Sequence, residues 1–152
     1  MREIEFRGKD NNGRWRYGCY VKFEGLQGAI YYPIYHKKRA DEFVVVRTDW
    51  CYVDENTVCQ YTGQKDKNGK RIFEGDIVEC VSWNEYFSKD GKPMEPFRRK
   101  MFVDYRKGGF KMVEPMPEPM KDNEWDIICN GDIVVIGNIH DDPQLIDIKR
   151  LG

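Results

Sequence analysis

The chain has 152 residues, of which 40% are hydrophobic and 14% aromatic, and its 25 basic and 26 acidic side chains leave a net charge of −1. This length fits one domain or two small subdomains, and the apolar content is enough to bury a core. The near-zero charge excludes global electrostatic steering towards nucleic acid or membranes, so any such binding needs a local patch.

The first ten residues, MREIEFRGKD, are charged from the second position, so we do not expect them to form a secretory leader. The longest aliphatic runs, at 43–46 and 133–136, are too short to span a bilayer. The five cysteines form no CxxC pair, and neither histidine lies near a cysteine pair. We therefore expect a cytoplasmic protein of a bacterial host, with reduced thiols, no metal, no cofactor and no membrane contact.

Strand periodicity dominates the first sixty residues. Along residues 14–23, alternate side chains share one face: Trp15, Tyr17, Cys19, Val21 and Phe23. The Asn-Gly pair at 12–13 predicts a tight turn before this strand, and so a hairpin with the residues preceding it. Residues 29–35 and 42–53 are predicted as further strands, with Pro33 placing the first of them at an edge or a bulge.

A second loop repeats the chemistry of the first. KDKNGK at 65–70 resembles KDNNGR at 9–14, and in both the Asn-Gly pair tolerates positive φ. We expect two surface hairpin turns with solvated charges. After the second loop, Gly75 leads into a short buried strand, and positive φ or a bulge is expected at this glycine. The letters GDIV recur at 131–134, which predicts the same tight entry into a second strand.

The middle of the chain carries two further turn signals, at 88–91 and 106–109. Around the second turn we expect a hairpin in which Tyr105 pairs with Phe110, both facing inwards. The outward cross-strand pairs would then be Asp104 with Lys111 and Phe102 with Val113.

The C-terminal third is predicted to lack long helices. Three prolines at alternate positions within 114–120 indicate an extended, exposed connection. Near the end of the chain, Asp142 is expected to cap a last turn of helix that has Pro143 at its first position.

Two segments, residues 60–78 and then residues 135–146, resemble in sequence the YopX family of small proteins encoded by bacteriophages and prophages. Residues 6–18 resemble that family's opening, whereas 81–130 match only in general character. The resemblance implies a β-rich protein from a mobile element, with an SH3-like barrel in its C-terminal half. It supplies no enzymatic activity and no catalytic residue. The expected organisation is an N-terminal β subdomain over 1–60 and the barrel subdomain over 61–152, sharing a core.

Candidate catalytic residues are few, and the chain is not expected to be an enzyme. No nucleophile elbow, P-loop, dinucleotide fingerprint or HExxH motif occurs. His140 lies beside Asp141 and Asp142, which suits either a metal or acid–base site or an ordinary helix start, and the capping rule favours the helix start. Glu74 and Asp76 flank a glycine and are interpreted as solvated turn residues, the alternative being a carboxylate cluster at the mouth of the barrel.

The best binding signal is the basic, aromatic stretch 97–111, called here the basic hairpin. It contains six lysines and arginines against one acid, with four aromatic residues between them. An extended strand would offer cations for phosphates and a ring for base stacking. The nucleic-acid candidates are Arg98, Lys100, Phe102, Arg106 and Lys111. The competing interpretation is a solvated strand face whose charges block edge pairing.

Two functional hypotheses of different class follow. The leading one is a non-catalytic interaction module that binds a protein partner from phage or host, with self-association through an edge strand as an additional possibility. The alternative is a small β-barrel that binds single-stranded nucleic acid through the basic hairpin.

Overall fold

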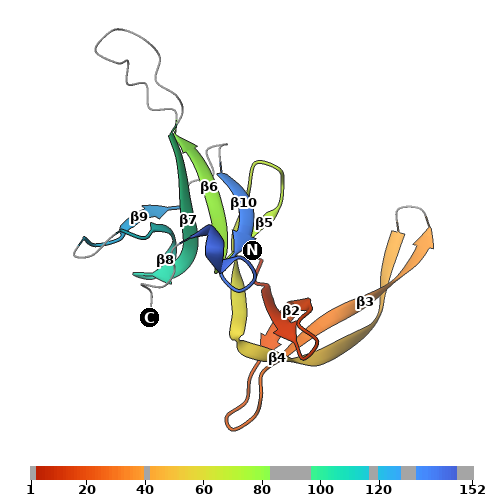
Figure 1. Ribbon diagram of the computed structural model, residues 1–152. Helices are drawn as coiled ribbons and strands as arrows, with labels where there is room; N and C mark the ends of the chain where they lie inside the picture. The colour runs from red at the N-terminus through yellow and green to blue at the C-terminus, as the bar shows by residue number, and fades with distance from the viewer. Residues whose placement is uncertain (1–2, 40–41, 83–96, 117–119, 128–132, 147–152) are drawn as a thin grey trace, which may run out of the picture. The chain divides into compact units, whose positions relative to one another are not determined.

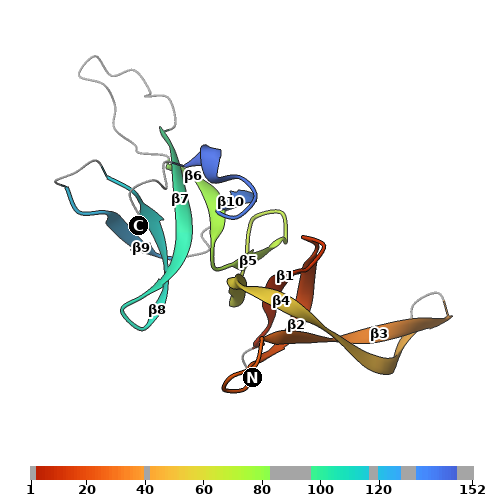
Figure 2. The same ribbon diagram turned by 60° about the horizontal axis from the view of Figure 1, so that its bottom comes forward.

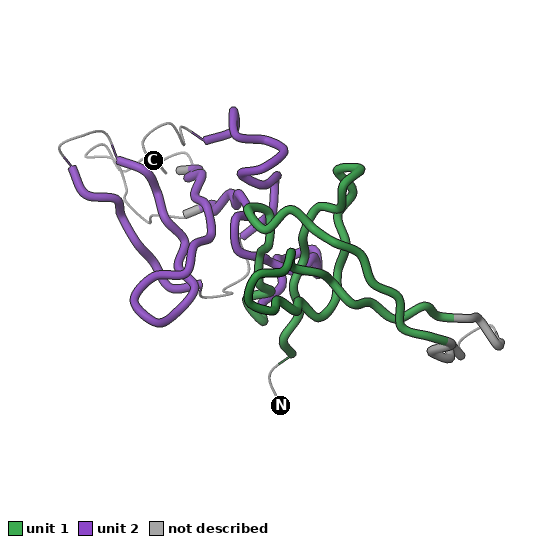
Figure 3. Tube along the Cα trace, turned by 90° about the horizontal axis from the view of Figure 1, so that it is seen from below, with its two compact units in different colours: residues 1–63 green, residues 64–152 purple. Residues whose placement is uncertain are grey.

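The computed structural model describes residues 3–39, 42–82, 97–116, 120–127 and 133–146 (Figure 1). It divides into two compact units, residues 1–63 and residues 64–152 (Figure 3). The described elements are antiparallel strands and one short 3-10 helix, which confirms the predicted mainly β fold. The expected boundary at residues 60/61 stays a prediction. Within the described ranges, no helix has the length and apolarity needed to cross a membrane.

Unit 1 is built from four antiparallel strands, with β4 continuing two residues beyond its boundary: β1 (Phe6–Asp10), β2 (Trp15–Val21), β3 (Ala29–Arg39) and β4 (Glu42–Lys65). The predicted N-terminal hairpin is confirmed, because β1 pairs with β2 around a turn in which Gly13 has φ 73°. Strand β1 also pairs with β4, so the pairings β1–β2–β3–β4–β1 form a closed ring (Figure 2). Closure leaves β1 without a free edge.

The inside of this ring is small and aliphatic. Ile30 and Val53 are fully buried, and they pack over Gly8. A Cβ at Gly8 would lie 3.2 Å from Val53 Cβ and 3.3 Å from Ile30 Cδ1, so glycine provides the space that these two side chains occupy. A ring this narrow has room for a few aliphatic side chains and little else.

Unit 2 contains the remaining elements: β5 (Arg71–Phe73), β6 (Asp76–Ser82), β7 (Phe97–Arg106), β8 (Gly109–Glu114), β9 (Asn123–Asp126), β10 (Ile133–Asn138) and the 3-10 helix η1 (Pro143–Leu145). Five of the strands form an antiparallel sheet in the order β10-β6-β7-β8-β9. The strands that begin within the two GDIV segments, β6 and β10, lie side by side, with Val78 opposite Val135. Closure of this unit into an SH3-like barrel stays a prediction.

The β7–β8 hairpin has the predicted register. Tyr105 pairs with Phe110, Asp104 with Lys111 and Phe102 with Val113. The expectation that Tyr105 faces inwards is wrong: its side chain is 55% exposed, because it lies next to the turn, at the end of the hairpin. The predicted turn at 88–91 and residues 117–119 of the proline-rich connection lie outside the described residues.

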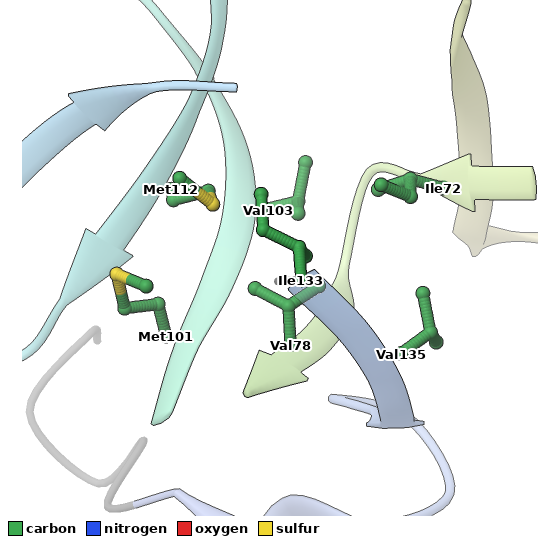
Figure 4. Packing of buried hydrophobic residues seen from close by; sticks show 7 residues of the cluster. All are labelled: Ile72, Val78, Met101, Val103, Met112, Ile133 and Val135. Atoms are coloured by element: carbon green, nitrogen blue, oxygen red, sulfur yellow. The ribbon is translucent and has the colours of Figure 1, made fainter. Parts of the chain in front are cut away.

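The sheet of unit 2 is covered on both faces. On one face, side chains from five strands pack together (Figure 4): Ile72, Val78, Met101, Val103, Met112, Ile133 and Val135. The other face carries a second buried cluster of Ile77, Phe102, Val113 and Ile146. Adjacent buried residues on one strand, such as Ile77 and Val78, are the signature of a strand with both faces covered.

The chain after β10 covers the second face. Ile139, Leu145 and Ile146 pack on that cluster, and a turn around Asn138 brings them there. Gly137 permits the close approach, since a Cβ at this position would lie 2.6 Å from the carboxylate Oδ2 of Asp142. Pro143 occupies the first position of η1 as predicted, but Asp142 makes no side-chain capping bond, because its carboxylate accepts the backbone N–H of Asn138 (3.2 Å).

Asp66 connects the β4–β5 turn to β10. Its Oδ1 accepts the backbone N–H groups of Asn68 (2.8 Å) and Lys70 (2.9 Å) within the turn. Its Oδ2 accepts the backbone N–H of Val135 (3.1 Å), 69 residues away. The expectation of a solvated charge is wrong here, because the residue is 7% exposed. Burial acts to raise the pKa of Asp66, but the hydrogen bonds from Val135, Lys70 and Asn68 outweigh it and leave the pKa below the ordinary value.

Gly75 has φ 74°, which confirms the expected positive φ at the entry to β6. Both of its backbone polar groups are used: its N–H donates to the carbonyl of Val103 (2.7 Å), and its carbonyl accepts the N–H of Ile139 (2.8 Å). The turn between β5 and β6 is therefore fixed to β7 on one side and to the C-terminal turn on the other.

Gly75→Val should destabilise the fold by about 1–3 kcal/mol, because a β-branched residue is strained at this φ. Urea unfolding measures the change. Gly109→Val is the matched control, because that glycine is not in the positive-φ region and a Cβ there meets no atom within 4 Å. Equal unfolding midpoints for the two variants would contradict the strain argument.

Asp66→Asn should cost about 1–3 kcal/mol near neutral pH, because the amide oxygen can replace only one of the two carboxylate acceptors. The folded pKa lies below the unfolded one, so the ionised group stabilises the fold above the unfolded pKa, and this stabilisation is lost as the pH falls through the folded pKa. The gap between parent and variant should thus shrink in acid. Asp126→Asn, at an exposed position, is the control; a pH-independent gap for Asp66→Asn would refute the linkage.

Candidate functional site

The cations of the basic hairpin are held by carboxylates. Arg98 Nη1 lies 2.7 Å from Glu79 Oε2, on the neighbouring strand β6. Lys111 pairs with Asp126 on β9. Two of the five predicted nucleic-acid residues therefore already have anionic partners within the chain, and a phosphate would have to compete with these carboxylates.

Arg106 is the most heavily paired cation of the hairpin. Its guanidinium lies 2.8 Å from Asp104, 3.2 Å from Glu124 and 3.4 Å from Asp122. The hydrogen bond to Asp104, with those to Glu124 and Asp122, raises the pKa of Arg106. Lys107 adds a 2.7 Å contact to Glu124, and hydrogen bonds from Lys107 and Arg106 lower the pKa of that carboxyl group. Around Arg106, three carboxylates thus meet two cations.

Strand β9 supplies two of these carboxylates, Glu124 beside Arg106 and Asp126 beside Lys111. The sequence analysis did not predict this strand. Glu124 and Asp126 alternate with Trp125 along β9, so both acids lie opposite β8 on the face away from the first core cluster. The alternation of acid, aromatic and acid at Glu124, Trp125 and Asp126 was the sequence signal from which this strand could have been predicted. Among the hairpin cations that the structure describes, Lys100 alone has no ion pair, and it is exposed.

Phe102 is not available for base stacking, which corrects the sequence hypothesis. It is 4% exposed and belongs to the second buried cluster, together with Ile77 and Val113. The strand face that was expected to meet solvent is covered at this point by the chain after β10. The ring of Phe102 is therefore not exposed for stacking next to the cations Arg98, Lys100 and Arg106.

A hollow of about 640 Å³ opens beside Arg106. Its polar lining consists of the paired charges Arg106, Lys107, Asp122 and Glu124 together with Lys121 and Asn123, and Met116 and Met120 are its apolar neighbours. Four of the five charges on its wall are paired with one another, and Lys121 is the remaining cation.

The polar residues around His140 form a turn. The side-chain oxygen of Asn138 accepts the N–H groups of His140 and Asp141 (both 3.0 Å), and its amide nitrogen donates to Asp141 Oδ2 (2.9 Å). Over the described ranges, no group of three or more His, Cys, Asp or Glu side chains is arranged to hold a metal ion. The carboxylates of this segment thus serve the turn that brings the chain back over the sheet.

Asp76 differs from its sequence interpretation as a solvated turn residue. It is 1% exposed, and its Oδ2 accepts the backbone N–H of Phe73 (2.8 Å) across the β5–β6 turn. Glu74 is partly buried, and both residues make further interactions. These two carboxylates therefore belong to the turn that also holds Gly75.

Unit 1 presents a row of large exposed aromatic side chains, here called the aromatic face. Cys19 on β2 lies opposite Tyr31 on β3, which in turn lies opposite Trp50 on β4. The rings of Tyr31 and Trp50 stack at 6.2 Å, and those of Trp50 and Tyr52 meet edge to face at 5.1 Å. The exposed members are Tyr17 (46%), Tyr31 (37%), Trp50 (48%), Tyr52 (46%) and the thiol-bearing Cys19.

The cation next to the aromatic face is Arg7, which lies opposite Tyr17, is buried, and has its guanidinium 4.7 Å from the centre of the Trp15 ring. Of the charged residues of unit 1, several pair with each other away from it: Arg16 with Asp10 (2.8 Å), Lys22 with Glu55, and Arg47 with Asp49 (3.6 Å). The sequence analysis recognised the alternation on β2 but did not combine it with β3 and β4, because the face forms only when the three strands pair.

Phe102→Ala should lower the free energy of unfolding by about 3–5 kcal/mol, because it leaves a cavity in the second buried cluster. Tyr105→Ala on the same strand is the control and should change stability much less, since that ring is exposed. Denaturant unfolding of both variants makes the comparison. A Phe102→Ala variant that keeps full stability but loses affinity for single-stranded DNA would restore the stacking hypothesis.

Comparison with known proteins agrees with the fold. The family model described as "YopX protein" matches residues 5–147. Protein EF1440 from Enterococcus faecalis, known from its crystal structure, superposes with a TM-score of 0.55 at 21% identity, and the match covers 96% of this chain and 99% of that one. At this identity the likeness concerns the fold alone. No curated protein matches the sequence.

The family match spans both segments that carried the resemblance, 60–78 and 135–146, and nearly all of the chain around them. In the structure these segments are in contact, through the β6–β10 pairing, the Asp66–Val135 hydrogen bond and the Gly75–Ile139 hydrogen bond. The residues that define the pattern are therefore those that hold unit 2 together. The chain belongs to the YopX family.

Proposed function

We propose that this protein is a non-catalytic interaction module of phage or prophage origin, which works in the cytoplasm of a bacterial host and binds a protein partner through the aromatic face. The observation that carries the proposal is the exposure of four neighbouring rings, Tyr17, Tyr31, Trp50 and Tyr52, across strands β2, β3 and β4. Tyrosine and tryptophan are the residues most enriched at the energetic centres of protein interfaces.

The chemistry of the face favours protein over nucleic acid as the partner. Base stacking alone binds single strands weakly without cations that follow the phosphates. Beside the aromatic face, Arg7 is buried against the Trp15 ring. On the basic hairpin the ring of Phe102 is buried, while Arg98, Arg106 and Lys111 are paired. We therefore do not propose the nucleic-acid alternative.

A non-catalytic role is supported by the use that the structure makes of its polar groups. Asp66 and Asp76 accept backbone hydrogen bonds that fix turns, and Asp142 accepts the N–H of Asn138. Each of these carboxylates makes a structural hydrogen bond, and that bond explains why the residue lies where it does.

Site-specific photocrosslinking in a bacterial host lysate tests the proposal. A benzophenone amino acid at Tyr52 should give a discrete protein adduct, whereas the same group at Tyr105, an exposed aromatic position of unit 2, should not. With the adduct identified by mass spectrometry and the partner purified, Trp50→Ser should weaken binding at least about tenfold, as expected for a central aromatic residue. Equal adducts from both positions, or unchanged affinity of Trp50→Ser, would exclude the face as the binding surface.

A further inference from the structure

We infer that the loop between β2 and β3, residues 22–28, is a second binding surface, which inserts Phe23 and Leu26 into an apolar pocket of a protein partner whose rim carries cations. The inference goes beyond the proposed function, because this loop lies outside the four rings of the aromatic face and is tested separately. The β2–β3 loop projects beyond the ends of both strands (Figure 1).

A tight turn brings the two apolar side chains of the β2–β3 loop together. The N–H of Leu26 donates to the carbonyl of Phe23 (3.1 Å), and Gly25 has φ 74°. This is a β-turn with glycine at its third position, in which the first and fourth Cα atoms lie less than about 7 Å apart. Phe23 and Leu26 occupy these two positions and are 63% and 62% exposed. Single exposed apolar residues are ordinary, but turns are normally polar, so an apolar pair on one turn indicates a contact surface.

The polar groups of the loop hold its base. Lys22 pairs with Glu55 on β4, and the other oxygen of that carboxylate accepts the N–H of Gly28 (2.9 Å). Gln27 Nε2 donates to the carbonyl of Val53 (3.3 Å). The loop is thus attached to β4 at both of its ends. A loop that is already held in place loses less conformational entropy on binding, which favours association.

Glu55 reaches the loop because β4 is irregular at this point. The pairing of β1 with β4 shifts register between Arg7 and Lys9, and residues 55–58 of β4 form a bulge there. Thr57 fixes the bulge, because its hydroxyl oxygen accepts the N–H of Lys9 (2.8 Å) across the strand pair. Bulges re-aim side chains of the bulged strand, and here the re-aimed side chain is the carboxylate that holds the loop.

The charge of Glu24 determines which class of partner the loop fits. This residue is exposed, follows Phe23 in the turn, and has no ion-pair partner among the residues that the structure describes. Lys22 is already paired with Glu55. The cytoplasmic surface of a membrane is negative and attracts cationic segments, so a loop that presents a carboxylate beside its apolar pair is unsuited to it. A protein pocket with lysine or arginine at its rim would accept both the apolar pair and the carboxylate.

Site-specific photocrosslinking of the full chain in a bacterial host lysate tests this inference. A benzophenone amino acid at Phe23 should give a discrete protein adduct, and the same group at Met120, which is 61% exposed in unit 2, should not give that adduct. Glu24→Lys in the chain that carries the probe at Phe23 should abolish the adduct. Asp126→Lys, the same change of charge at an exposed position of unit 2, should leave it unchanged.

Affinity measurements with the purified crosslinked protein make the test quantitative. Phe23→Ser and Leu26→Ser should each raise the dissociation constant at least about tenfold, as expected for side chains seated in a pocket. Glu24→Lys should slow association, most strongly at low salt, because it replaces an attraction to the rim by a repulsion. Met120→Ser is the control and should bind as the parent does. Circular dichroism of each variant confirms that the fold is retained.

The inference would be overturned by the lack of a discrete adduct at Phe23, by an adduct that persists in Glu24→Lys, or by unchanged affinity of both serine variants. Co-sedimentation with vesicles of phosphatidylglycerol and phosphatidylethanolamine that is lost in Phe23→Ser would also overturn it, because the loop would then bind a membrane surface. Failure at Phe23 together with a discrete adduct at Tyr52 would exclude only the loop, and the reverse result would exclude only the aromatic face.

Discussion

The buried carboxylate of Asp66 is the interaction on which unit 2 depends. One of its oxygens closes the turn between β4 and β5, and the other accepts the N–H of Val135 on β10. A short local loop therefore fixes the position of a strand that begins more than sixty residues later in the chain. The pairing of β6 with β10 and the hydrogen bond between Ile139 and Gly75 follow from that placement. A neutral side chain with one acceptor could not satisfy both the turn and the strand.

The same loop chemistry serves a different purpose in unit 1. Asp10 Oδ1 accepts the N–H groups of Asn12 (2.9 Å) and Arg14 (3.0 Å), as Asp66 Oδ1 does with Asn68 and Lys70. The second oxygen makes the difference, because Asp10 Oδ2 pairs with the guanidinium of Arg16 on the next strand. The repeated Lys-Asp-x-Asn-Gly sequence is thus one turn used twice, once to close a local hairpin and once to join distant strands.

Short-range features of the fold could be predicted from the sequence because they depend on neighbouring residues. The register that pairs Asp104 with Lys111 follows from the turn between them, and the positive φ of Gly75 follows from its place between charged residues at a strand entry. The burial of Phe102 could not be predicted from its hairpin alone, because the covering residues come from the end of the chain. The neutralisation of Arg106 depends on β9, which lies beyond the proline-rich connection. Both of these errors arose from treating the hairpin without the segments that pack beside it or over it.

The narrow interior of unit 1 gives a physical reason for the position of its aromatic residues. Alternate residues on a strand point to opposite sides, and the inner side between β1, β3 and β4 is already filled by Ile30 and Val53 packed over Gly8. Rings as large as Trp50 and Tyr31 do not fit beside them, so they stack on the outer surface instead. Exposed rings carry a solvation cost that smaller polar residues at the same positions would avoid. The proposed role as a binding surface offers a reason for their exposure, because a partner that covered the rings would remove this cost.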